Sequence, residues 1–103
     1  MKTKYILTGI FGNTVRIKIL EVLLETNLEK EMTWLNISEI AKIAGISTSS
    51  SKRIVDQLIQ ENLVEKKPIQ THAQNPEKEI HLNLDNKIVR ELIFFYRKLR
   101  GFS

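Results

Sequence analysis

Apolar residues recur along this chain with a helical period over its first third. Between Asn13 and Leu28 they form a broad arc on a helical wheel, leaving only a narrow polar strip of Lys18, Glu21 and Glu25. The arc contains Ile17, Ile19, Leu20, Val22, Leu23, Leu24 and Leu28. A helix with so little polar surface is usually central to its fold. The pattern therefore predicts a central helix, capped by Asn13, that ends near Leu28.

Two shorter helices separated by a glycine are predicted next. Asn36 and Glu39 have the spacing of a capping box, in which each side chain accepts a hydrogen bond from the backbone N–H of the other residue. Gly45 supplies the left-handed residue that often ends a helix. Ser47 caps the second helix, which we expect to run to about Glu61. The inward positions expected for this helix are Ser51, Ile54, Val55, Leu58 and Ile59.

Short strands are expected on both sides of this helix pair. Residues 32–35 form one candidate strand, and residues 63–69 form another after Asn62, which tolerates a left-handed conformation. Residues 80–84 alternate apolar side chains with His81 and Asn83, the period of a half-buried strand. The last two strands are expected to pair as a hairpin.

A last helix, capped by Asp85, is predicted to run to about Arg100. Its apolar side chains cover about half of its circumference. The elements together predict a mostly α fold with a small β-hairpin (α+β), in the order helix, strand, helix, helix, strand, strand, helix. We divide the chain into an N-terminal arm (1–10), a central domain (11–84) and a C-terminal helix (85–103).

Composition narrows the class of protein. The chain has 103 residues, enough for one small domain, and no cysteine, which excludes disulfide scaffolds, thiolate metal sites and cysteine nucleophiles. No apolar run approaches the ~18 residues of a membrane span, and the N-terminal stretch lacks a signal-peptide cleavage site. We therefore expect a cytoplasmic protein with no membrane partner. Fourteen isoleucines against three alanines suit an AT-rich genome, and together with the missing cysteine they favour an archaeal or archaeal-virus source.

Nothing in the sequence favours catalysis or a cofactor. There is no glycine-rich phosphate loop and no acid–base pair built around a histidine. His72 and His81 lie in a predicted loop and a predicted strand, without the spacing of helical metal ligands. We therefore expect no enzyme activity, no cofactor and no metal.

The net charge of +4 permits a nucleic-acid partner but is unevenly distributed. Residues 85–103 carry five basic and two acidic side chains, whereas residues 36–64 carry three of each. A DNA-binding hypothesis must therefore depend on local geometry and not on overall basicity.

The segment NISEIAKIAGISTSSSKRIVDQLIQENLVEKK, residues 36–67, resembles the winged helix-turn-helix regulators of the ArsR and MarR type. The stretch FGNTVRIKILEVLLE, residues 11–25, is similar to the first helix of that family, so the resemblance covers residues 10–84. Ser51 occupies a position where the family usually has Val, which implies less burial there or a hydroxyl bonded back to the backbone. Asn62 replaces the usual Gly. The Cys and His/Asp clusters of metal-sensing members are missing, so metal sensing is not implied.

The resemblance implies that the helix after Ser47 enters the DNA major groove and that the hairpin, or wing, touches the phosphate backbone. Small polar side chains at the helix start suit close approach to DNA, and an arginine suits guanine. Asp56 and Glu61 are expected to point away from DNA. The candidate DNA-binding residues are Arg16, Asn36, Ser47, Thr48, Ser49, Ser50, Lys52, Arg53, Lys66, Lys67, His72, Gln74 and Lys78.

Each of these signals also has a simpler interpretation. A Ser/Thr cluster is typical of a solvated helix start, and Arg53 is placed to form a surface ion pair with Asp56. The hairpin lysines are offset by Glu65, Glu77 and Glu79, as in an ordinary polar hairpin.

The last helix has more apolar surface than one contact inside a small monomer needs. We expect a two-fold homodimer built on it, with Tyr5, Ile6 and Ile10 of the arm beside it. The alternative is that the helix only completes the core of a monomer. The candidate interface residues are Ile88, Leu92, Phe94, Phe95, Tyr96 and Leu99.

The leading hypothesis is a sequence-specific transcriptional regulator whose partners are double-stranded DNA and a second copy of itself. Its two recognition helices would lie ~34 Å apart on an inverted repeat. The neutral middle segment keeps a second hypothesis open, a winged-helix module for protein–protein interaction.

Overall fold

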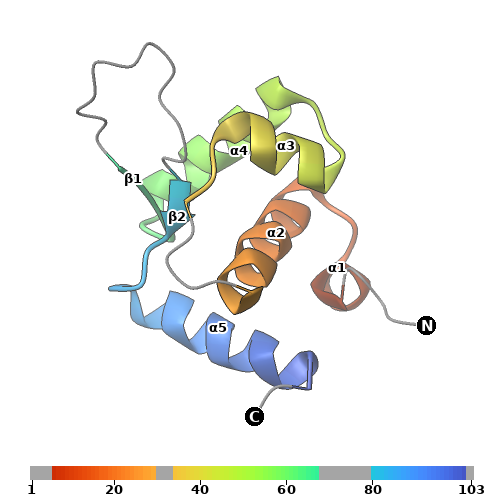
Figure 1. Ribbon diagram of the computed structural model, residues 1–103, viewed down its shortest axis with the longest axis vertical. Coiled ribbons are helices and arrows are strands. Elements are labelled where there is room, and N and C mark those ends of the chain that lie inside the picture. Colours follow the sequence, from red (N-terminus) through yellow and green to blue (C-terminus); the bar gives the residue numbers. More distant parts are fainter. Residues whose placement is uncertain (1–5, 30–33, 68–79, 102–103) are drawn as a thin grey trace.

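The computed structural model describes residues 6–29, 34–67 and 80–101, and it is mostly helical with a two-stranded antiparallel sheet (Figure 1). This confirms the predicted α+β class. The elements are α1 (Ile6–Phe11), α2 (Val15–Glu29), α3 (Ile37–Ala44), α4 (Thr48–Gln60), β1 (Val64–Lys66), β2 (Ile80–Leu82) and α5 (Lys87–Leu99). Within the described ranges, none of the helices combines the length and apolar character needed to cross a membrane.

Helix α2 lies at the centre of the molecule, as its pattern predicts. It packs against α1, α3, α4, α5 and β2, and Figure 1 shows α3 and α4 on one side of it and α5 on the other. Ile19, Val22 and Leu24 are almost completely buried. Even the predicted polar strip is partly buried, because Glu21 has only 1% of its surface exposed.

All but the last residue of helix α1 lie within the segment expected to be an arm. This six-residue helix packs against α2, and the side chain of Leu7 belongs to the main core, with 3% of its surface exposed. Helices this short are marginal in isolation, so their sequence pattern is weak. Contact with α2 stabilises α1, and this contact could not be inferred from local periodicity.

Two of the predicted helix caps are displaced by one residue. Helix α2 begins after Thr14, whose hydroxyl accepts a hydrogen bond from the backbone N–H of Ile17 at 3.1 Å, so the prediction of Asn13 is wrong. Helix α5 is capped by Asn86, which accepts from the N–H of Ile88 at 2.8 Å, and not by Asp85. In both cases two adjacent residues have good capping side chains, and the sequence cannot choose between them.

The sheet pairs Val64 with Leu82 and Glu65 with His81. Of the candidate strand at residues 32–35, Leu35 forms an isolated bridge to Ile80, with N···O distances of 2.8 and 2.9 Å. Residues 32 and 33 lie outside the described residues, as does the segment 68–79 that connects the two strands.

His81 is buried, contrary to the alternation that predicted a half-buried strand. Only 3% of its surface is exposed, its Nδ1–H donates to the carbonyl of Leu82 at 2.7 Å, and its ring lies 5.1 Å from that of Trp34. Trp34 comes from the segment before α3 and covers the sheet face that period-two alternation assigns to solvent. This burial is a tertiary effect, which a strand pattern cannot reveal.

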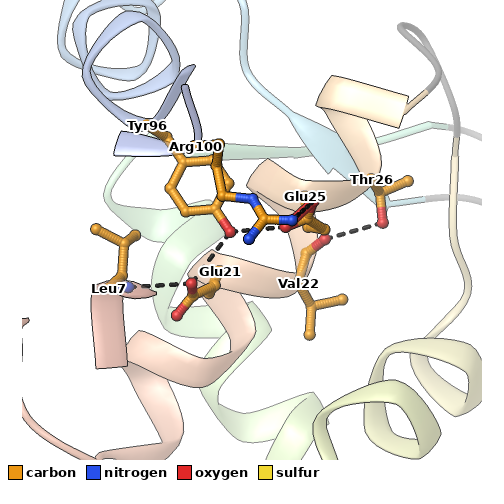
Figure 2. Close-up of polar contacts among 7 residues, drawn as sticks. All are labelled: Leu7, Glu21, Val22, Glu25, Thr26, Tyr96 and Arg100. Carbon is orange, nitrogen blue, oxygen red and sulfur yellow. Dashed lines mark hydrogen bonds and ion pairs between the residues drawn. The ribbon is translucent and has the colours of Figure 1, made fainter. Parts of the chain in front are cut away.

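A buried polar network joins α1, α2 and α5 (Figure 2). The carboxylate of Glu21 accepts hydrogen bonds from the backbone N–H groups of Leu7 and Thr8, each at 3.0 Å, and from the hydroxyl of Tyr96 at 3.0 Å. The same hydroxyl lies 2.8 Å from Glu25, which also pairs with Arg100 at 3.3 Å. A buried carboxylate needs such partners, because leaving it unpaired is costly.

Burial raises the pKa of the Tyr96 phenol well above its ordinary value, and the adjacent Glu25 and Glu21 carboxylates raise it further. The hydroxyl therefore stays protonated and remains a hydrogen-bond donor.

Replacing Tyr96 with Phe removes only the hydroxyl from this network. We expect the free energy of unfolding to fall by about 1–3 kcal/mol, because Glu21 stays buried but loses one donor. Urea unfolding followed by circular dichroism measures the change. Gln57→Ala is the control, because Gln57 is exposed on α4 and its replacement should change stability by less than about 0.5 kcal/mol. Equal effects of the two substitutions would contradict the role assigned to the network.

Candidate nucleic-acid interface

The connection between α3 and α4 is built by local capping chemistry. The side chain of Asn36 accepts from the N–H of Glu39 at 2.7 Å, and the Glu39 carboxylate accepts from the N–H of Asn36 at 3.0 Å. Gly45 has a φ of 73°, and its N–H donates to the carbonyl of Ala41 at 2.9 Å. Ser47 then accepts from the N–H of Ser50 at 3.1 Å and starts α4. All these predicted signals are confirmed.

Helix α4 presents one narrow face to the core. Ser51, Val55 and Leu58 have no exposed surface, and Ile54 is also buried. The Ser51 hydroxyl donates to the carbonyl of Ser47 at 3.0 Å, so this buried polar atom is satisfied within the helix itself. The hydroxyl thus bonds back to the backbone, one of the two outcomes expected at this position.

The opposite face of α4 is exposed over its whole length. At about 100° per residue, a line of side chains runs along this face, and it consists of Ser49, Arg53, Asp56 and Gln60. Lys52 and Gln57 flank the line and are also exposed. We call these six residues the outward face of α4.

Asp56 lies on this outward face, whereas we expected it to point away from DNA. Its angular position on the helix is close to that of Ser49, two turns earlier. Gln57 and Gln60 were missed as candidates, although the same helical wheel contains them. The angle around the helix axis, and not the distance from the helix start, decides which of these side chains share a face.

Ion pairs engage two of the basic residues near this face. Lys52 pairs with Asp56 at 3.3 Å, and Arg16 at the start of α2 pairs with Glu61 at the end of α4. Arg53 is exposed and makes no hydrogen bond or ion pair with another described residue. Asp56 therefore pairs with Lys52, and the ion pair with Arg53 that the sequence offered as a simpler alternative is not formed.

The other candidate contact residues have mixed positions. Thr48 and Ser49 are exposed, and Ser50 is half-buried. The side chains of Asn36 and Ser47 are used as helix caps. Lys66 and Lys67 are exposed, and the Lys67 ammonium lies 5.7 Å from the centre of the Trp34 ring. His72, Gln74 and Lys78 lie outside the described residues.

The candidate dimer residues on α5 are divided between its two faces. Ile88, Phe94 and Phe95 are exposed, and the ammonium of Lys98 lies 4.5 Å from the centre of the Phe94 ring. Leu92 and Leu99 are half-buried against the core. Tyr96 has no exposed surface, so it belongs to the network with Glu21 and not to an outer surface.

In the described part of the chain, no group of three or more His, Cys, Asp or Glu side chains is placed to hold a metal ion.

Comparison with solved structures supports the fold alone. The chain is similar to the crystal structure of RV1404 from Mycobacterium tuberculosis, with a TM-score of 0.56 and 18% sequence identity. The match covers 92% of this chain and 60% of that one, so the present chain spans about three fifths of the length of its structural neighbour. No protein-family model and no curated protein matches the sequence.

The cap at Ser47 should be the most sensitive exposed position at the start of α4. Ser47→Ala leaves the N–H of Ser50 without its side-chain acceptor, and we expect a loss of about 0.5–2 kcal/mol in the free energy of unfolding. Thr48→Ala, one residue later and also exposed, should cost less than about 0.5 kcal/mol. Thermal unfolding of the two variants measures the difference. Similar losses would show that the cap has no special role.

Proposed function

We propose that this protein is a winged helix-turn-helix transcriptional regulator of the ArsR and MarR type, which binds double-stranded DNA in the cytoplasm. The observation that carries the proposal is the outward face of α4. It is a capped, polar, fully exposed helix face that follows a tight turn and carries an arginine with no hydrogen-bond or ion-pair partner among the described residues. A B-form major groove is ~12 Å wide and accepts one helix of this kind.

The neighbouring elements are compatible with this placement. Helix α3 precedes α4 through the Gly45 turn, and the β1–β2 sheet follows α4 directly, where a wing would lie (Figure 1). The exposed Lys66 and Lys67 are at the end of β1 that leads into the connection between the strands. Their role would be contact with phosphates, because basic side chains hold DNA through its backbone.

A specific observation favours the alternative, a module for protein–protein interaction. Two of the basic residues near the outward face, Arg16 and Lys52, are paired with carboxylates. The local charge is therefore nearly balanced, and non-specific attraction to DNA, which depends on unpaired positive charge, would be weak. Binding by such a face requires direct contact with bases.

We also propose that the regulator acts as a two-fold dimer. Ile88, Phe94 and Phe95 expose apolar surface on α5, and Ile10 and Phe11 expose more on α1. A symmetric contact buries such surface on both copies at once. Two outward faces would then lie ~34 Å apart and contact an inverted repeat.

DNA binding is tested on duplexes selected from a random pool. We expect the logarithm of the binding constant to fall linearly with the logarithm of salt concentration, with a slope of about −0.9 per phosphate contacted. Arg53→Ala should weaken binding by about 1–3 kcal/mol, and Lys52→Ala should reduce the steepness of the slope by about 1. Lys87→Ala removes the same charge from an exposed position on α5 and serves as the control. Equal binding by Arg53→Ala, Lys52→Ala and Lys87→Ala would favour the protein-interaction alternative.

The oligomeric state is tested separately by light scattering. The wild-type chain at micromolar concentration should show twice the 12.0 kDa mass of one chain. Phe95→Glu places a charge on the exposed apolar side of α5 and should give the monomer mass, whereas Lys42→Glu, at an exposed position on α3, should not. A wild-type monomer at this concentration refutes the dimer.

A further inference from the structure

Arg53 and Asp56 are neighbours on the line of residues that runs along the outward face of α4. Both are exposed, and three residues of helix separate them by about 4.5 Å along the axis. Successive base pairs of B-form DNA are ~3.4 Å apart. Two side chains at this spacing can therefore contact the same base pair or two adjacent base pairs.

The two side chains have opposite hydrogen-bonding chemistry. The guanidinium of Arg53 only donates, and it makes no hydrogen bond or ion pair with another described residue. The carboxylate of Asp56 only accepts, and in the free protein it holds Lys52 at 3.3 Å. Both members of that ion pair are more than half exposed, so the pair is weak and Asp56 can exchange it for another donor.

A carboxylate on a DNA-facing surface is repelled by phosphates and needs a compensating donor. In the major groove the exocyclic amino groups of cytosine and adenine are such donors, whereas guanine offers two acceptors to an arginine. Only a G·C pair combines the two acceptors with an amino donor on the opposite base. An A·T pair does not offer an arginine two acceptors on one base.

We propose that Arg53 and Asp56 form a donor–acceptor pair that selects a G·C base pair beneath the middle of α4. Arg53 donates to the guanine O6 and N7 atoms, and Asp56 accepts from the cytosine N4 amino group. Asp56 also lowers affinity for DNA that lacks this cytosine, because its charge is then left facing phosphates. This inference rests on the proposed DNA-binding function and adds to it the base pair that the face selects.

The test combines protein variants with base-pair replacements. A duplex selected by the wild-type protein is compared with versions in which each G·C pair is replaced in turn by A·T. For the wild type, one replacement should weaken binding by about 5- to 150-fold. Arg53→Ala and Asp56→Ala should each lose most of this penalty at the same base pair. Asp56→Ala should in addition bind random duplex more tightly than the wild type at low salt.

Asp85→Ala is the matched control. It removes one exposed carboxylate from the turn before α5, so it changes the net charge equally without altering the outward face. It should retain the full base-pair penalty and the weak binding to random duplex. Circular dichroism and thermal unfolding establish that every variant is folded, as expected for exposed positions.

The possible failures are distinguishable. If the wild type shows no salt-dependent binding to any duplex, the proposed function itself is wrong, and the inference falls with it. If the wild type selects a sequence but Asp56→Ala keeps every base-pair penalty, only the inference is overturned. A selected site made entirely of A·T pairs overturns it as well.

Discussion

The burial of the Glu21 carboxylate is the constraint on which the arrangement of the helices depends. A charged group inside the core must be surrounded by donors, and here they come from two other helices. The N–H groups of α1 and the phenol of Tyr96 on α5 both converge on it (Figure 2). Apolar burial is non-directional and specifies the positions of these helices along α2 less strictly. The hydrogen bonds give each helix one position, because any shift leaves a buried charge unsatisfied.

A different kind of chemistry positions the outward face of α4. Its geometry comes from contacts within a few residues: the capping box of α3, the left-handed Gly45 and the Ser47 cap. The buried Ser51 hydroxyl also finds its acceptor one turn back in the same helix. The core therefore has only to hold α4 by its apolar side. The outward face of α4 therefore does not contribute to the core, and its side chains are available to contact a partner.

The charges around this face restrict what it can bind. The ion pairs of Lys52 with Asp56 and of Arg16 with Glu61 reduce the attraction for any polyanion. In the proposed complex with DNA, this face would rely on matched hydrogen bonds more than on charge. The same balance explains why the net charge of the chain, concentrated after residue 84, says little about the candidate site.

Local patterns in the sequence determined the identity of most elements. The central helix, both caps of the α3–α4 pair and the left-handed residues Gly45 and Asn62 follow from side-chain chemistry within a few positions, and the structure has them all. Only the tertiary structure decided what depends on distant segments. It stabilised the short α1, buried His81 beneath Trp34 and placed Tyr96 inside the core. It also paired Asp56 with Lys52 in place of Arg53. Periodicity shows which side chains share a face, but the partner that covers that face comes from elsewhere in the chain.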